Sequence, residues 1–305
     1  KSLGDAHRFA FGLEGSRTDT SKPWSSVTVT QRTGTSYPVE PRMADTQTDR
    51  LGAYVQDEIT FALAGRRATL IPAARVDRFK LTPDNSPAYL AVNAGQPVPA
   101  FDATAVSPKL GFVLALVPRV NVFGQYNRGF RYPTAEDLTA TFTNPVARYK
   151  TRPNPALQEE TSDAFEVGLK GQPARNLTLR AAAFYTRYDD FIEQIVATGG
   201  FDPAWPAGVF QTQNRASARI HGGEVFARYD IGGGISTTAA VGYAKGSYQT
   251  LDGARVPLST IEPFKANAAL AYAAGRGRWG AALSAEFADA KRPGRGAQFR
   301  QPAYT

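Results

Sequence analysis

The sequence contains no cysteine, one methionine and two histidines in 305 residues. Without cysteine the chain forms no disulfide, no thiolate zinc site and no cysteine nucleophile. The two histidines, His7 and His221, are too few for a multi-histidine metal centre. These absences favour a protein without a metal centre of its own, while a serine–histidine hydrolase stays open.

Long hydrophobic runs are also missing. The longest one, GFVLALV at 111–117, is too short for a membrane-spanning helix. Transmembrane β-strands alternate between apolar and polar residues and need only about 9–11 residues, so a membrane location stays open. The formal charge of +8 calls for an anionic neighbour such as lipid phosphate or an acidic ligand.

The ends of the chain indicate a longer protein. It begins at Lys1 without an initiator methionine or signal peptide, and it ends at Thr305 in what resembles the start of a strand. We therefore expect residues 1–305 to be an internal piece.

Period-2 alternation dominates the sequence, and helical periodicity is almost absent. In WGAALSAEF (279–287) and FKANAALAY (264–272) the apolar face carries an aromatic residue at each end and small aliphatic residues between. Eight residues span roughly 26 Å, or roughly 20 Å at a tilt of about 40°, close to the apolar band of an outer-membrane barrel. We predict that these rings form aromatic girdles. The girdle residues are Phe264, Tyr272, Trp279 and Phe287.

The alternating segments predict about eleven strands whose connections are long and short in strict turn. This sorting of loop lengths by parity is typical of an antiparallel up-and-down transmembrane β-barrel. Eleven strands leave both sheet edges open, which hydrocarbon does not tolerate. The all-β fold is therefore expected to be part of a larger barrel. The predicted strands are 6–14, 48–61, 67–81, 106–117, 119–130, 162–171, 176–194, 210–230, 235–248, 264–273 and 278–290.

Several motifs receive plain structural interpretations. GRGRWG (275–280) matches the dinucleotide fingerprint, but a strand follows it instead of the required helix, so we interpret it as a hairpin turn. The pairs Asp189/Asp190 and Glu159/Glu160 are interpreted as solvated charges at the long-loop rim. His221 shares a face with Gly223 and Val225 and is expected to lie at the lipid interface.

The basic stretch KRPGRGAQFR (291–300) lacks acidic residues and contains a single aromatic residue, Phe299. Nucleic-acid binding interleaves aromatics with such a run, so no nucleic-acid partner is expected. On a long-loop rim, lipopolysaccharide phosphates are the nearer partner, and lining for an anionic ligand is the alternative.

Two boxes flank the longest central loop. YNRGFRYPTAEDL (126–138) introduces it, and NPALQEETSDAFEVGLKG (154–171) closes it. Together they resemble the boxes of TonB-dependent outer-membrane receptors, especially the haem/haemoglobin-receptor branch, with Tyr132 and Ala156 as departures. TDRLGAYVQDEI (48–59) and PLSTIEPFK (257–265) are similar to other barrel segments of the same receptors.

The resemblance implies a barrel of about 22 strands, of which this chain supplies roughly the ninth to the nineteenth. The plug domain, the TonB box, the early strands and the last strands then lie outside residues 1–305. It further implies active uptake in the Gram-negative outer membrane, driven by TonB, with haem, a haem protein or a ferric chelate as the transported ligand. A receptor of this kind is not an enzyme and holds no permanently bound cofactor.

The resemblance also supplies the candidate site residues. No histidine stands between the boxes, so Tyr132 and Tyr149 are the candidate ligands for haem iron, because tyrosinate ligates ferric haem. Arg180 and Glu224 are expected to line the barrel lumen. The predicted ligand loop comprises Phe130, Arg131, Tyr132, Pro133, Tyr149, Asn154, Pro155 and Leu157.

Three alternatives stay open at this point. A ferric siderophore in place of haem leaves the architecture unchanged. A passive porin-like channel would lack a plug, and its uptake would survive loss of the proton gradient. A secreted all-β adhesin or enzyme domain would pack its apolar faces against a second sheet.

Overall fold

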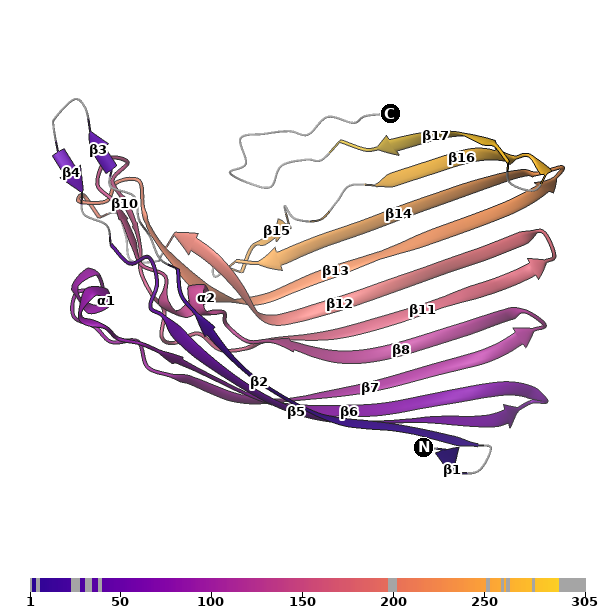
Figure 1. The fold of residues 1–305 in the computed structure, drawn as a ribbon, viewed down its shortest axis with the longest axis horizontal. Coiled ribbons are helices and arrows are strands. Elements are labelled where there is room, and N and C mark those ends of the chain that lie inside the picture. The colour runs from indigo at the N-terminus through magenta and orange to yellow at the C-terminus, as the bar shows by residue number, and fades with distance from the viewer. Residues whose placement is uncertain are drawn as a thin grey trace.

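The computed structural model describes residues 2–3, 6–22, 28–30, 35–37, 40–196, 202–250, 253–258, 261, 264–275 and 278–290. The long strands form one antiparallel sheet that curves around a hollow (Figure 1), and residues 28–30 and 35–37 form a separate two-stranded sheet. The long strands follow one another in chain order, so each is hydrogen-bonded to its sequence neighbours. The basic stretch 291–300 and Gly277 lie outside the described residues.

The eleven predicted strands are all present, and the all-β meander is confirmed. Most of them extend beyond the predicted ends toward the long loops, because ladder pairing continues where the apolar alternation has faded. They are β2 (His7–Thr20), β5 (Thr46–Leu63), β6 (Arg66–Pro83), β7 (Phe101–Val117), β8 (Val120–Arg131), β11 (Glu160–Ala174), β12 (Leu177–Val196), β13 (Val209–Gly232), β14 (Ile235–Gln249), β16 (Lys265–Ala273) and β17 (Gly280–Ala288).

The short connections lie together at one end of the sheet (Figure 1). Ala64 and Gly65 link β5 to β6 with φ of 48° and 74°, and Gly233 and Gly234 link β13 to β14 with φ of 61° and 83°. Two consecutive positive φ values define the type I′ turn, whose twist matches that of the flanking strands. The long connections gather at the opposite end, as the parity of the loops predicts.

The long loops, and the N-terminal segment before β2, contain short elements that the sequence pattern did not reveal. Within the described residues, neither helix is long and apolar enough to span a membrane. These elements are β1 (Ser2–Leu3), β3 (Thr28–Thr30), β4 (Thr35–Tyr37), α1 (Pro87–Val92), α2 (Ala135–Thr139), β9 (Phe142–Asn144), β10 (Tyr149–Thr151) and β15 (Arg255–Pro257).

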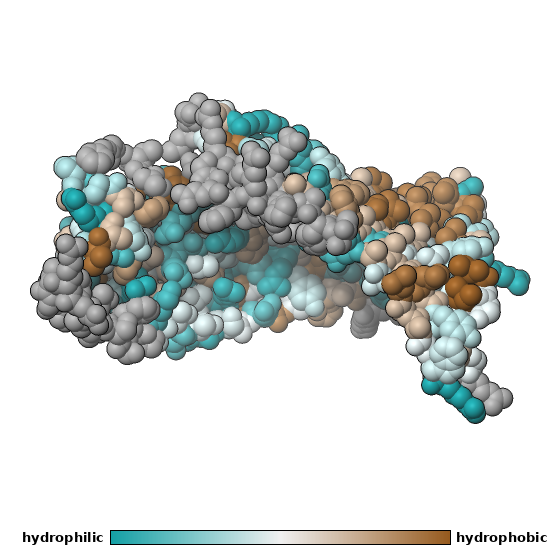
Figure 2. Space-filling view, turned by 90° about the horizontal axis from the view of Figure 1, so that it is seen from above, coloured by the Kyte–Doolittle hydropathy of each residue, from teal (hydrophilic) through white to brown (hydrophobic). Residues whose placement is uncertain are grey.

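The two faces of the sheet differ in polarity. Strand register places Val225 opposite Val241, and Val241 opposite Ala266, so one apolar row crosses several strands. Large side chains on this face are open, with Leu13 85% and Leu283 76% exposed. Figure 2 shows hydrophilic residues in the hollow and hydrophobic residues concentrated outside, toward the short-turn end. A polar inside and an apolar outside are the reverse of a water-soluble fold and fit a wall that faces lipid.

The predicted girdle residues occupy the two ends of this outer face. Phe264 lies beside Phe287, with ring centroids 6.2 Å apart, and Tyr272 lies beside Trp279, at 5.2 Å. The first pair is toward the long loops and the second is at the short turn. The paired rings bracket the small aliphatic residues of β16 and β17.

One charged residue interrupts the apolar face of β5. Asp57 lies opposite Phe9, and its Oδ2 is 2.7 Å from Nδ1 of His7 on the neighbouring strand. The recorded pairing of β5 with β6 also skips Asp57 and Glu58, next to Pro72, which has no N–H to donate. A hydrogen bond between the His7 and Asp57 side chains therefore accompanies the break in the ladder.

Candidate ligand-binding mouth

The first box packs its aromatic residues into the base of the loops. The Tyr132 ring stacks on Phe79 of β6, with centroids 4.4 Å apart, and meets the edge of Phe101 at 6.2 Å. Phe130 lies 4.7 Å from Tyr132 on the other side. Toward the long loops, the hydrogen-bonded pairing of β7 with β8 ends at Lys109 and Asn127. The rings of Phe79, Phe101, Phe130 and Tyr132 lie beyond that point.

The second box joins the same base. Leu157 is 3% exposed and belongs to one buried cluster with Phe79, Leu81 and Leu138. The Asn154 side chain donates to the Thr212 carbonyl at 2.9 Å and accepts from the backbone N–H of Ala156 at 3.1 Å. The two boxes, which are separate in sequence, are therefore brought together on Phe79, while Pro155 of the second box is exposed.

Arg131 is held by two carboxylates. Its guanidinium lies 2.8 Å from Asp137 and 3.5 Å from Glu160. The interpretation of Glu160 as a solvated charge is wrong: it is 7% exposed, and its Oε2 accepts the backbone N–H of Ile192 at 3.0 Å. Glu160 satisfies a strand N–H and Arg131 together, which a sequence pattern of adjacent acids does not reveal.

A short helix closes this arrangement. Thr134 caps α2 and forms a capping box with Asp137, in which each side chain accepts the other residue's backbone N–H. Pro133 directly before the cap is fully buried. Pro133 was predicted to contact the ligand. In the structure it is buried directly before the N-cap of α2, where it fixes the start of that helix.

We call the long-loop end of the barrel wall, where the two boxes pack on Phe79, the mouth. On its inner side lies a cavity of about 670 Å³, within the range of roughly 300 to 1,000 Å³ typical of small-molecule sites. It lies over the long-loop ends of β2, β5 and β6 and the start of α2. Its lining combines aromatic, apolar and cationic groups. Its lining includes Thr20, Lys22, Met43, Arg50, Phe79, Leu81, Tyr132, Pro133 and Glu136.

Two cations face this cavity, and they differ in their partners. Lys22 Nζ lies 3.0 Å from Glu136, so its charge is matched. Arg50 is exposed, its guanidinium carbon lies 5.3 Å from the Phe79 ring centroid, and no acidic partner is recorded for it in the part of the chain described. Arg50 is therefore the cation at this cavity whose charge is not matched by a carboxylate among the described residues.

The two candidate iron ligands lie in different surroundings. The Tyr132 hydroxyl donates to the Asp77 carbonyl at 3.0 Å, and burial raises the pKa of its phenol above the ordinary value. Both effects disfavour the tyrosinate form that ligation needs. Tyr149 lies on β10 between the ring edges of Phe142 and Phe210, at 5.6 and 5.8 Å.

The remaining predicted residues lie where alternation puts them. Arg180 on β12 and Glu224 on β13 lie on the face opposite to Ala181 and Val225, with the Arg180 guanidinium 5.9 Å from the Phe226 ring centroid. Among the described residues, no three His, Asp or Glu side chains gather closely enough to hold a metal ion.

Sequence reasoning missed Arg50, Arg42 and Phe79 as site residues. Alternation in TDRLGAYVQDEI already places Arg50 on the polar face with Tyr54, so its inward position was predictable. The position of Arg42, 4.1 Å from the Phe142 ring centroid, depends on how two distant loops meet, and no local pattern encodes it.

Comparison with known proteins assigns the whole chain to one family model. The model described as TonB dependent receptor-like, beta-barrel matches residues 1–305.

Sequence relatives are named for haemoglobin use. The Hemoglobin-haptoglobin utilization protein B of Neisseria meningitidis serogroup C is 28% identical over 258 residues, covering 76% of this chain and 31% of that protein. The Hemoglobin and hemoglobin-haptoglobin-binding protein A of Haemophilus influenzae is 26% identical over 198 residues, covering 62% of this chain and 18% of that protein. The chain thus spans less than a third of the length of these relatives.

Solved structures share the fold. The copper transporter OprC superposes with a TM-score of 0.70 at 19% identity, covering 94% of this chain and 41% of that one. The Serratia marcescens hemophore receptor HasR, solved with its hemophore HasA and heme, gives a TM-score of 0.68 at 18% identity, with 94% and 50% covered. At these identities the likeness concerns the architecture alone.

Proposed function

The chain belongs to the TonB-dependent receptor β-barrel family of the bacterial outer membrane, and from this we propose that it forms wall and outer mouth of a receptor that imports haem or haem iron. The observation that carries the ligand assignment is the 28% identity over 258 residues to a haemoglobin-haptoglobin utilization protein. The cavity in the mouth supports it independently.

The cavity suits the chemistry of haem as cargo. Haem has a flat apolar face and acidic propionates, so a site for it needs aromatic or aliphatic walls and a cation. Phe79 and Tyr132 supply stacked rings, and Arg50 presents an unmatched guanidinium beside them. In this proposal Arg50 binds a propionate, and the partly buried Tyr132 ring, supported from behind by the buried Phe79, contacts the porphyrin.

Iron ligation belongs to the same proposal. The hydrogen bond and raised pKa of Tyr132 make Tyr149 the better of the two phenol candidates. Phe130, Arg131 and Pro133 are proposed to hold the mouth in shape for the ligand, and Asn154, Pro155 and Leu157 to hold the second box against it.

We propose that the complete receptor contains the parts that the family resemblance implies. A plug fills the hollow against the polar wall that carries Arg180 and Glu224, and a TonB box upstream of the plug binds TonB. Uptake then depends on the proton gradient and involves no covalent chemistry. Haem or a haem protein is the outer partner, and lipopolysaccharide surrounds the long-loop rim.

The experiment that tests the ligand is a titration of the complete receptor with haemin, followed by the Soret band. Saturable binding with a shifted band is the expected result. If the Soret band does not respond, and a ferric siderophore binds tightly instead, the haem assignment is wrong and the siderophore alternative holds.

Energy dependence tests the transport class. Uptake by cells that express the receptor is expected to stop when a protonophore collapses the proton gradient or when TonB is deleted. Uptake that continues under both conditions would identify a passive channel.

A further inference from the structure

The outer face of β12, β13 and β14 carries basic side chains directly opposite one another. Arg187 on β12 pairs in register with Arg219 on β13, and His221 on β13 pairs with Lys245 on β14. Residues opposite each other on antiparallel strands have Cα atoms roughly 4.5 to 5.5 Å apart. Like charges at that spacing destabilise a sheet unless an anion lies between them.

Acidic neighbours neutralise only part of this charge. Asp189 lies 2.9 Å from Arg187, and Asp163 lies between Arg128 and Arg187 in register while accepting the Tyr126 hydroxyl at 2.7 Å. The outer face here carries two carboxylates and four cations, Arg128, Arg187, Arg219 and Lys245, so its net charge is positive. We call these four cations together with His221 the basic cluster.

Arg219 is the least satisfied member of the basic cluster. Its Nε is buried and has no hydrogen-bond partner among the described residues. A buried guanidinium N–H without an acceptor is costly, so the Arg219 side chain is poorly compensated within the protein, and its accessible part is available to an external anion.

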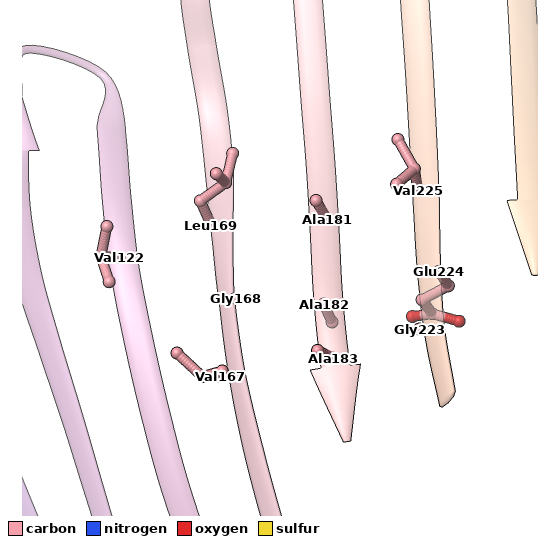
Figure 3. A pocket seen from close by; sticks show the side chains of 10 residues that line it. All are labelled: Val122, Val167, Gly168, Leu169, Ala181, Ala182, Ala183, Gly223, Glu224 and Val225. Atoms are coloured by element: carbon pink, nitrogen blue, oxygen red, sulfur yellow. The ribbon is translucent and has the colours of Figure 1, made fainter. Parts of the chain in front are cut away.

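An apolar groove of about 430 Å³ lies on the same strands, closer to the short turns. Figure 3 shows its lining: Ala181 and Ala183 on β12 form a low floor between the larger side chains of Val167 and Leu169 on β11 and Val225 on β13. Gly223 extends the floor on β13. The groove is open along the face and is almost wholly apolar.

The distance between the basic cluster and the apolar groove suits a lipid, whose phosphate and acyl chains are separated along the membrane normal. Arg187 lies four positions after Ala183 on β12, which is about 13 Å along a strand. The aromatic ring of Tyr185 lies between them, at the height where girdle residues meet the headgroups. Cations above the ring and an apolar channel below it follow the order of phosphate and acyl chain in an outer leaflet.

We propose that this face binds one phosphate-bearing, acylated lipid of the outer leaflet, of the lipid A type. A phosphate lies between the accessible parts of the Arg187 and Arg219 guanidinium groups, with His221 and Lys245 beside it. An acyl chain lies in the groove over Ala181, Ala183 and Gly223. The proposal rests on the outer-membrane location proposed above and not on the identity of the imported ligand.

The test measures lipid affinity of the complete receptor in nanodiscs of neutral phospholipid, with bisphosphorylated lipid A as the probe. Replacing the facing arginines (R187Q together with R219Q) is expected to weaken binding roughly tenfold to a hundredfold, the effect of losing charge-assisted hydrogen bonds. The control R78Q changes an exposed outer-face arginine that is already paired with Asp102 at 3.1 Å. It is expected to alter affinity by less than about twofold.

A second pair of variants tests the groove. Ala183→Trp fills the groove and is expected to weaken binding of lipid A while leaving a deacylated phosphosugar unaffected. Ala239→Trp adds the same bulk on the outer face of β14, outside the groove lining, and is expected to have no such effect. Unchanged heat-modifiable mobility of each variant on gels checks that the barrel folds.

Three results would overturn the proposal. They are equal affinity of the arginine double variant and wild type, equal binding of dephosphorylated lipid A, and complete competition by millimolar inorganic phosphate, which would identify a free-anion site. Haemin titration of the same samples separates this proposal from the transport function, because the arginine variants are expected to bind haemin like wild type.

Discussion

Replacing Tyr132 by phenylalanine distinguishes a packing role from iron ligation. The change removes one hydroxyl, which donates to the Asp77 carbonyl at 3.0 Å, and it keeps the ring that stacks on Phe79 at 4.4 Å. One such hydrogen bond contributes about 1 kcal/mol to stability. We therefore expect Tyr132→Phe to loosen the loop base by about that amount and to leave the cavity in place.

The assay is haemin titration of the complete receptor, with the Soret band as readout. Because burial raises the Tyr132 pKa and its proton is donated to a carbonyl, the phenolate is scarce at neutral pH. Tyr132→Phe is expected to keep the wild-type Soret position, with a Kd altered by a factor of about five at most. Tyr132→Ala, which also removes the stacked ring, is expected to cost about 3 kcal/mol and to expose the loops to protease.

The reasoning is refuted by one specific pattern. If Tyr132→Phe abolishes the haemin-induced band while Tyr149→Phe leaves it intact, Tyr132 ligates the iron and its packing in this structure does not represent the bound state. Loss of the band in Tyr149→Phe alone would support Tyr149 as the ligand.

Further predictions concern the mouth and its supports. Arg50→Gln is expected to weaken haemin binding roughly tenfold, as the loss of one charge-assisted bond does; an unchanged Kd would remove Arg50 from the site, and Arg17→Gln, at an arginine paired with Asp49 at 2.6 Å, is the control. Leu157→Ala is expected to destabilise the loop base by about 2–4 kcal/mol and to speed its proteolysis, whereas Val146→Ala, at an exposed position, leaves the cleavage rate unchanged. Burial raises the pKa of Tyr89 to about 12, so the stability it contributes is complete below pH 10 and declines as the pH rises from 10 toward 12. Tyr89→Phe is expected to flatten that part of the pH dependence of α1 unfolding, measured by protection of the loop from protease, and a curve like that of wild type would contradict it.

Alternation predicted the strands well because the two faces of a β-strand are a local property. Each residue's side is set by its neighbours at one and two positions, and the solvents on the two faces differ along the whole wall. The eleven strands, the alternation of short and long connections and the outward position of His221 all follow from this. Arg50 was within reach of the same rule.

The loops obey no such rule. α1 and α2 are each a single turn or two, too short for a helical period to stand out from composition. Their presence depends on caps and on buried contacts with other segments, such as Leu138 of α2 against Phe79 of β6.

The sequence by itself determined the wall: an open meander with an apolar outside, a polar inside and rings at both margins, because lipid and water act on alternate residues of every strand. Only the tertiary structure decided the chemistry of the mouth. Stacking of Tyr132 on Phe79, enclosure of Glu160 and the isolation of Arg50 join residues far apart in the chain, and contacts of that kind arise when curvature and loop packing bring the strand ends together.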